Sequence, residues 1–136
     1  LINIGIEPFL VAGAVNAVLA QRLARRICPA CLAHDPTSDE ARSILQPYGS
    51  VPETLAGGHG CRACRSSGYT GRLALYELLT MNDTLRDRVA SSPTVIDFRN
   101  LCRSEGMSSL RDEGVKRVLD GTTTIEEVLR VTDAFG

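Results

Sequence analysis

The sequence predicts an α+β fold that is mainly helical. Four segments after residue 82 have the length, capping residues and apolar spacing of helices. A shorter apolar run, Leu73–Leu79, follows a turn-rich segment and has the composition of a β-strand. Apolar residues make up 43% of the 136-residue chain and charged residues 23%, as in globular proteins. We therefore expect a folded core, with room for one ordinary domain or two small ones.

The N-terminal segment is predicted to begin with a buried helix. Pro8 suits the first turn of a helix that runs to about Ala20, and apolar residues occupy most of its circumference. This stretch is too short to cross the roughly 30 Å hydrocarbon core of a membrane. Beyond it, Leu19, Leu23 and Ile27 fit helical spacing, but the alternation of a strand also fits. Periodicity leaves both interpretations open.

Four of the five cysteines form two pairs with the same spacing, and 29 residues separate the pairs. The pairs are Cys28 with Cys31 and Cys61 with Cys64. Each CxxC turn places two sulfurs on one side of a tight loop, so two such loops together offer four thiolates to a tetrahedral Zn²⁺ ion. Four protein ligands leave no position for water, and the predicted site is therefore structural rather than catalytic.

Two other uses of paired cysteines remain open. A thioredoxin-like redox motif needs a CxxC at the N-terminus of a helix and would leave the second pair unexplained. Structural disulfides are typical of exported proteins, and the sequence shows neither a secretory signal nor an even number of cysteines. The fifth cysteine, Cys102, shares a helical face with Val95 and Phe98, which predicts a small buried core residue.

Cationic and histidine side chains near the cysteines could modify the metal site. Four arginines lie within a few residues of the ligands: Arg25, Arg26, Arg62 and Arg65. Their guanidinium groups would favour the thiolate form and offset the net negative charge of Zn²⁺ with four thiolates, unless they are ordinary exposed side chains. His34 and His59 flank the insert between the pairs, and each could replace a ligand.

The insert between the cysteine pairs is rich in turn-forming residues. It is predicted to hold one short helix, Ser38–Gln46, with Thr37 and Glu40 as its capping box. Tyr69 lies in the glycine-rich turn after the second pair. It could pack on the metal loop, or it could be an exposed contact for a partner.

Four helices are predicted after the strand. Their ranges are Asp83–Ser91, Val95–Ser104, Ser109–Leu119 and Ile125–Thr132. Asn82 and Thr94 are the N-caps of the first two helices, and Thr124 with Glu127 forms a capping box for the last. Gly106 and Gly121 end the second and third helices.

The distribution of charge argues against nucleic acid as a partner. Residues 21–72 carry seven arginines against four acidic residues, and residues 73–136 carry eight basic against eleven acidic residues. The difference in charge between the two halves is too small to indicate phosphate binding, and the acidic half would repel phosphate groups. With three tyrosines, three phenylalanines and no tryptophan, a stacking platform for bases is also poorly supplied.

Several short runs together resemble the C-terminal part of the GspE/PilB family, the ATPases of type II secretion and type IV pilus assembly. The runs are Gly5–Leu10, Leu19–Leu23, Gly68–Arg72 before Leu75–Leu79, Gly106–Gly114 and Gly121–Val128. They surround the four cysteines and occur in the family's order over nearly the whole chain. Each run is weakly specific alone, and the set is specific.

The resemblance implies the end of a RecA-like domain of a hexameric ATPase, with a zinc-binding subdomain inserted on a β-hairpin and a small helical subdomain after it. It implies a division into 1–27 (edge of the RecA-like core), 28–71 (zinc subdomain), 72–81 (return strand) and 82–136 (four helices). It also favours a strand over residues 20–27, paired with residues 72–79.

The resemblance further implies partners and a location. The partners would be other subunits of a homo-hexamer and inner-membrane platform proteins, without nucleic acid and without membrane insertion. The protein would be cytoplasmic and peripheral at the bacterial inner membrane. ATP and Mg²⁺ would bind only to the longer parent protein.

The chain lacks the motifs that would make it an ATPase by itself. It contains no GxxxxGK[ST] loop and no hydrophobic strand that ends in paired acids for Mg²⁺. Because these motifs are absent, we expect that the chain cannot hydrolyse ATP alone. It begins Leu-Ile-Asn without an initiator methionine, so we expect a fragment of a longer protein. Catalytic residues are therefore expected only in the parent.

Arg22 and Arg72 stand at the ends of the proposed strand pair, with Glu77 in the second strand. An ion pair among them is one interpretation. The resemblance suggests another, in which one arginine lies near a subunit boundary and senses nucleotide.

Three functions of different classes are to be weighed, the first of them drawn from the resemblance. The first is a non-catalytic zinc-pinned arm of a secretion or pilus motor, which couples it to partners and to the assembly of pilin-like subunits. The alternative is a free-standing zinc-ribbon binding module for nucleic acid or protein. A redox protein is a third, and it predicts a reducible disulfide instead of bound metal.

Overall fold

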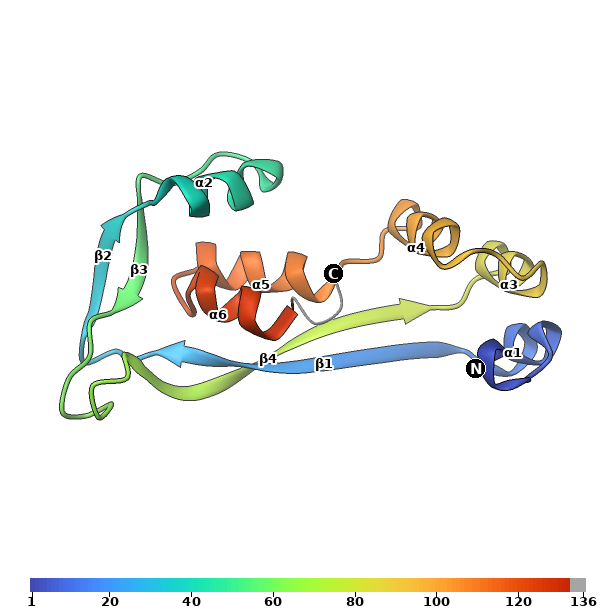
Figure 1. The fold of residues 1–136 in the computed structure, drawn as a ribbon, viewed down its shortest axis with the longest axis horizontal. Helices are drawn as coiled ribbons and strands as arrows, with labels where there is room; N and C mark the ends of the chain where they lie inside the picture. Colours follow the sequence, from blue (N-terminus) through green and yellow to red (C-terminus); the bar gives the residue numbers. More distant parts are fainter. Residues whose placement is uncertain (133–136) are drawn as a thin grey trace. The chain divides into compact units, whose positions relative to one another are not determined.

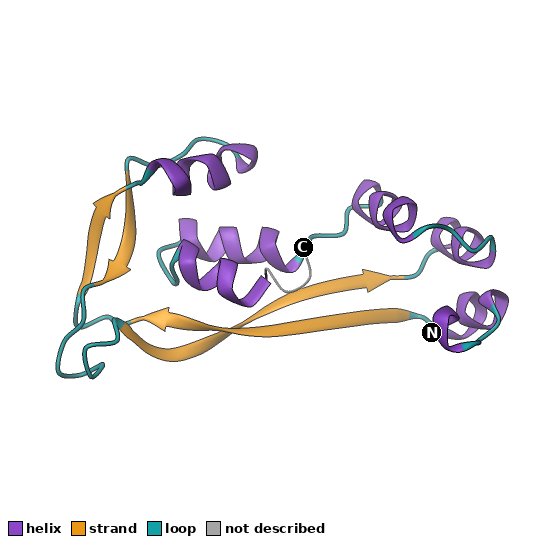
Figure 2. Cartoon of the chain, viewed as in Figure 1, coloured by secondary structure: helices purple, strands orange, loops and turns teal. Residues whose placement is uncertain are grey.

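The computed structural model describes residues 1–132, and Figures 1 and 2 show helices joined by two pairs of strands. In chain order the elements are η1 Ile2–Ile4, α1 Pro8–Ala14, β1 Ala17–Ile27, β2 Leu32–Pro36, α2 Asp39–Leu45, η2 Gln46–Tyr48, β3 Thr54–Gly58, β4 Tyr69–Thr80, α3 Asp83–Ala90, α4 Val95–Ser104, α5 Leu110–Leu119 and α6 Ile125–Thr132. Within this described part, none of the helices combines the length and apolarity needed to cross a bilayer. The predicted α+β class is confirmed.

The chain forms two compact units, each with its own core. Of the described residues, 1–20 and 77–109 form unit 1, and 21–76 and 110–132 form unit 2. The long strands β1 and β4 pair with each other and run antiparallel (Figure 1). The units cut the chain at points other than residues 27, 71 and 81, and the predicted four-part division stays a prediction.

The first helix is shorter and more exposed than the sequence predicted. Helix α1 ends at Ala14, because Val15 takes an extended conformation (φ −80°, ψ 122°). The carbonyl of Asn16 then accepts a hydrogen bond from the backbone N–H of Met81, 2.9 Å away, which draws the chain into β1. Phe9 is 64% exposed, and Ala12 is the buried residue of the helix. The prediction of a helix buried on most sides up to Ala20 was wrong.

The core of unit 1 lies among α1, α3 and α4. Its buried residues are Ala12, Met81, Leu85, Val89 and Cys102. Both predicted caps are confirmed, since Asn82 accepts a hydrogen bond from the N–H of Leu85 and Thr94 accepts one from the N–H of Asp97. Cys102 is 2% exposed, as predicted for a small core residue, whereas Val95 is 72% exposed.

The core of unit 2 joins α2 to the pair α5 and α6. Its buried residues are Ala41, Leu45, Val115, Val118, Ile125 and Val128. Helices α5 and α6 approach closely at Gly114, where a Cβ atom would come within 2.5 Å of Cγ1 of Val128. The cap of α2 is Ser38, whose hydroxyl accepts from the N–H of Ala41. The predicted Thr37 cap was wrong, because the Thr37 hydroxyl donates to the carbonyl of Pro52.

The strand pairing was predicted in part. Residues 20–27 do form part of a strand paired with the return strand, and both strands are longer than expected. The second pair, β2 with β3, was missed. It is antiparallel, with Leu32 opposite Gly58 and Pro36 opposite Thr54. The sequences LAHDP and TLAGG contain glycine, proline and aspartate, which strands disfavour, and so gave no strand signal.

Candidate metal centre

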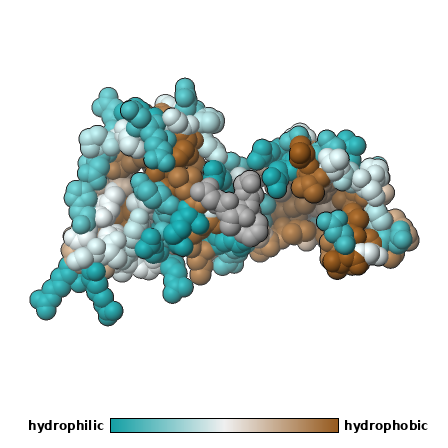
Figure 3. All heavy atoms as spheres, in the orientation of Figure 1, coloured by the Kyte–Doolittle hydropathy of each residue, from teal (hydrophilic) through white to brown (hydrophobic). Residues whose placement is uncertain are grey.

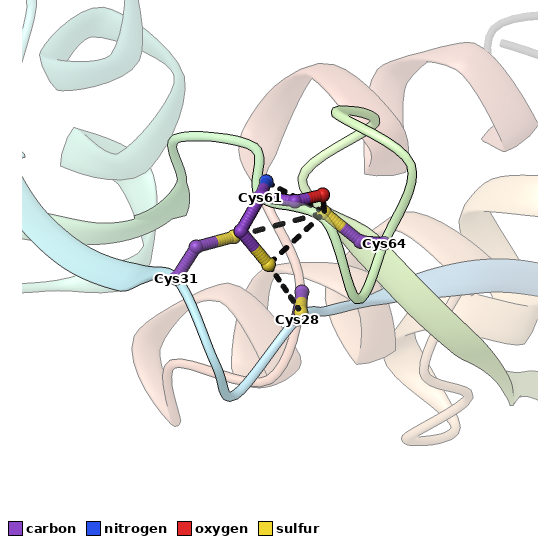
Figure 4. A group of neighbouring side chains, drawn as sticks. All are labelled: Cys28, Cys31, Cys61 and Cys64. Atoms are coloured by element: carbon purple, nitrogen blue, oxygen red, sulfur yellow. Dashed lines mark hydrogen bonds between the residues drawn. The ribbon is translucent and has the colours of Figure 1, made fainter.

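The cysteine cluster lies in unit 2, where the pair β1 and β4 is connected to the pair β2 and β3. Cys28 directly follows β1 and Cys31 directly precedes β2, while Cys61 and Cys64 lie on the loop between β3 and β4. The antiparallel ladder of β2 with β3 brings residues 32 and 58 opposite each other, and so returns the chain to the first pair. Figure 4 shows the four side chains pointing toward one another from these loops.

The sulfur positions match those of a tetrahedral metal site. All four Sγ atoms lie within 4.8 Å of one another. The distances are 4.0 Å from Cys28 to Cys61, 3.8 Å from Cys31 to Cys64 and 3.7 Å from Cys61 to Cys64. Four sulfurs around Zn²⁺, each about 2.3 Å from the metal, would be about 3.8 Å apart. The cluster is therefore the right size for such an ion.

Glycine at two positions allows the loops to come this close. A Cβ atom on Gly58 would lie 2.0 Å from the carbonyl oxygen of Gly68, and one on Gly68 would lie 2.4 Å from the carbonyl oxygen of Gly58. Gly68 also has a φ of +78°, which favours glycine. Its carbonyl accepts a hydrogen bond of 2.9 Å from the N–H of Cys28, which joins the first cysteine loop to the second.

The backbone around the second pair stabilises a negative sulfur. Burial opposes ionisation of Cys64, but N–H groups of Cys61 and Gly68 donate to its Sγ at 3.1 and 3.3 Å and lower its pKa to about 6. A hydrogen bond with the Thr70 side chain lowers the pKa of Cys28. Burial raises the pKa of Cys31 to about 12. Holding four thiolates together thus requires a cation that displaces the remaining protons.

The geometry does not support the redox and disulfide alternatives. All five cysteines are free, and the sulfur distances of 3.7 Å and more far exceed the roughly 2 Å of a disulfide. Each CxxC lies in a turn between strands, and neither begins a helix as a thioredoxin-like motif would.

The histidines and Arg25 make contacts other than those considered from sequence. The His59 ring forms an ion pair or hydrogen bond with Asp35, 2.8 Å away, and His34 is exposed. Neither histidine belongs to the cluster of possible ligands found among the described residues. Arg25 binds the carboxylate of Glu127, so its guanidinium group neutralises that residue and not the sulfurs.

Glu127 forms a buried polar junction beside the metal centre that the sequence did not reveal. Its side chain is fully buried and accepts hydrogen bonds from the backbone N–H of Arg25, from the Arg25 guanidinium at 2.7 and 3.0 Å, and from Arg130 at 2.5 and 2.9 Å. The hydrogen bonds from Arg130 outweigh the effect of burial and, with those from Arg25, lower the pKa of Glu127 to about 2. The predicted cap is half confirmed, because Thr124 accepts from the N–H of Glu127 but the Glu127 carboxylate holds arginines instead.

Tyr69 packs into this junction. Its hydroxyl lies 2.8 Å from that of Thr124, and the Arg25 guanidinium lies 4.2 Å from the centre of its ring. Of the two interpretations drawn from the sequence, packing is therefore the one that the contacts favour. Helix α6 is thereby joined to the C-terminal end of β1 and to the N-terminal end of β4.

Arg22 and Arg72 were the candidates for a nucleotide contact. Arg22 donates a hydrogen bond of 2.9 Å to the carbonyl of Gln21, and Arg72 is exposed on β4. Their proposed role near a subunit boundary stays a prediction.

Unit 1 contains a separate apolar cavity of about 680 Å³. Val11, Phe98 and Met107 are among its lining residues, and Glu77 and Arg99 are its charged ones. The cavity lies outside the cysteine cluster and brings together no set of catalytic groups.

Comparison with known proteins agrees with the resemblance. The family described as "Type II/IV secretion system protein" matches residues 1–130. The type IV pilus assembly ATPase PilB of Myxococcus xanthus is 41% identical over 134 residues, which is 95% of this chain and 23% of that protein. The type II secretion system protein E of Pseudomonas aeruginosa is 39% identical over 132 residues, 97% of this chain and 26% of that protein.

The match covers almost all of this chain but about a quarter or less of each relative. A further PilB, from Thermus thermophilus, is 35% identical over 132 residues, which is 96% of the chain and 15% of the relative. Both the family match and the identities thus extend over the cysteine loops and the helices on either side. The chain belongs to the type II/IV secretion system protein family, with pilus assembly and secretion ATPases as its relatives.

Proposed function

We propose that this chain is the zinc-binding and C-terminal helical part of a hexameric ATPase of type II secretion or type IV pilus assembly. In this proposal it is a structural arm through which the motor is coupled to its partners at the inner membrane. The convergence of four cysteine sulfurs within 4.8 Å, in a chain of this family, is the observation that carries the proposal.

Cys28, Cys31, Cys61 and Cys64 would hold the zinc ion. The sulfur spacing fits a tetrahedral site, and with four thiolates bound the ion has no open position for a reacting water. Its contribution would be stability, since zinc bound to four such ligands in small peptides supplies roughly 10–16 kcal/mol. The ion would join the loop after β1 to the loop before β4. It would thereby stiffen the end of the paired strands β1 and β4.

ATP hydrolysis, Mg²⁺ binding and the hexamer belong in this proposal to the longer protein. Arg72 is the better placed of the two candidate nucleotide sensors, because it is exposed while Arg22 contacts the backbone of its own strand. Replacing Arg72 with alanine in the longer protein should then lower the ATPase rate without changing the melting temperature. An unchanged rate would remove the sensor role and leave the arm intact.

The arm is tested by separating metal binding from ATP turnover. In the longer protein, Cys28→Ser should abolish stoichiometric zinc and strongly reduce pilus assembly or secretion, while the catalytic site elsewhere still hydrolyses ATP. Cys102→Ala is the matched control, because Cys102 lies in the core of unit 1 and outside the cluster. Normal assembly by a Cys28→Ser protein that has lost its zinc would contradict the proposal.

A further inference from the structure

Acidic residues are nearly absent from the chain segments around the cysteine loops, and the one in β2, Asp35, binds His59. Residues 8–34 and 54–76 have neither aspartate nor glutamate, yet they include six arginines. Glu127 neutralises Arg25. Four others are exposed and have no carboxylate partner within the described chain: Arg26, Arg62, Arg65 and Arg72. We call these four side chains the arginine rim.

The arginine rim is held by the same backbone that holds the sulfurs. The N–H of Arg65 donates to the carbonyl of Arg62 at 3.2 Å, so these two arginines begin and end one turn of the second cysteine loop. On the strands, Cδ of Arg26 lies 3.8 Å from the position of a Cβ on Gly71, which directly precedes Arg72. Figure 3 shows hydrophilic side chains projecting into solvent from this end of unit 2.

The rim remains positive after the metal is counted. Zn²⁺ with four thiolates carries a net charge of about −2, against four guanidinium groups. The surface therefore attracts anionic groups. The aromatic and apolar residues around the arginines determine whether it fits nucleic acid, a membrane or an acidic protein.

The surroundings of the rim favour neither nucleic acid nor a membrane. The Tyr69 ring is covered by the Arg25 guanidinium, and residues 28–31 and 59–68 contain no aromatic residue besides His59, so no free ring is available to stack on bases. The same two loops contain no leucine, isoleucine, valine, phenylalanine or methionine. The exposed leucine that directly follows the first loop, Leu32, is a single apolar side chain, far less than the apolar face with which a protein inserts into the headgroup region of a bilayer.

We propose that the arginine rim docks an acidic segment of a partner protein. Guanidinium groups bind carboxylates in a planar, two-pronged geometry, and an arm fixed by a metal presents them with little loss of conformational entropy. The inference rests on the proposed function, because it names the chemistry of the partner that the arm engages.

The test measures binding of a fluorescent peptide of alternating glutamate and glycine to the 136-residue chain. The double variant Arg62→Gln, Arg65→Gln should bind the peptide about tenfold more weakly at low ionic strength. The control Arg42→Gln, Arg88→Gln removes the same charge from exposed positions on α2 and α3 and should bind like the unmodified chain. A peptide with glutamine in place of glutamate should not bind.

Three outcomes would overturn the docking surface. They are equal weakening by the control variant, tighter binding to phosphatidylglycerol vesicles than to the peptide, and tighter binding to a single-stranded oligonucleotide. Zinc content, measured in the same samples, separates this inference from the proposed function. A chain that holds no zinc but still binds the peptide through Arg62 and Arg65 would refute the zinc-pinned arm and support the rim.

Discussion

Glu127 connects three parts of unit 2 through a single carboxylate. It lies on α6, binds Arg25 on β1, and shares Arg25 with the ring of Tyr69 on β4. Thr123, four residues earlier, strengthens the same connection, because its hydroxyl donates to the carbonyl of Arg25 at 2.8 Å. Arg25, the β1 residue of this junction, lies three residues before Cys28, so the junction should help to hold the first cysteine loop in position.

Replacement of this carboxylate should destabilise the protein. Glu127→Gln keeps the shape but removes the charge that accepts hydrogen bonds from Arg25 and Arg130, so we expect a loss of about 2 kcal/mol in the free energy of unfolding. Both arginines are about half exposed, which limits the cost of leaving them without a partner. Urea denaturation measures the effect, with exposed Glu126→Gln as the control, and equal stability of the two variants would contradict the account.

The same carboxylate should give a pH dependence in acid. Hydrogen bonds from Arg130 and then Arg25, opposed by burial, lower the pKa of Glu127 to about 2, from an ordinary value of 4.5. The folded state therefore binds this proton less readily than the unfolded state, and the stabilisation is complete above about pH 5 and is lost as the pH falls toward 2.

The stability difference between the unmodified protein and Glu127→Gln should accordingly shrink between neutral pH and about pH 2. Comparing the two proteins at each pH cancels changes that they share, such as protonation of the metal ligands. A difference that stays constant over this range would show that the lowered pKa has been misassigned.

At the scale of elements, the features that depend on neighbouring residues, such as helix bounds and caps, were predicted well. Pairings between distant segments were not. The bounds of α4 and α6 and the caps Asn82 and Thr94 follow from side chains within a few residues, and all were predicted. The pairing of β2 with β3 joins residues far apart in the sequence, such as Leu32 and Gly58, and gave no local signal. The contact of Arg25 with Glu127 spans 102 positions, and the Thr-x-x-Glu pattern instead indicated a local capping role.

The convergence of the four cysteines was predictable because CxxC spacing is local and repeated. What the sequence could not supply was the requirement for glycine at residues 58 and 68, where two backbones touch. That contact appears only when the strands β3 and β4 are placed in space.

Gly58→Ala should therefore weaken the metal site. Its Cβ would lie 2.0 Å from the Gly68 carbonyl oxygen, so the second cysteine loop must shift, at a cost of about 1–3 kcal/mol. Zinc retention in competition with a chelator should fall. Gly57→Ala is the control, since its Cβ would meet only the Asp35 side chain at 3.4 Å, and a similar loss in both variants would contradict the account.

At the scale of the whole molecule, the chain consists of two units with separate cores, and all four cysteines of the cluster lie in unit 2. Removal of zinc should therefore increase amide hydrogen exchange in β2, β3 and the cysteine loops far more than in α3 and α4. Mass spectrometry of peptides before and after chelation measures this. A uniform increase over both units would show that the metal stabilises the chain as one body.

In the proposed function, Cys28, Cys31, Cys61 and Cys64 bind one zinc ion. X-ray absorption at the zinc edge of the purified protein tests it most directly. We expect one zinc per chain with four sulfur neighbours at about 2.3 Å. A protein purified with zinc present that contains none, or a zinc ion with mainly nitrogen or oxygen neighbours, would contradict it.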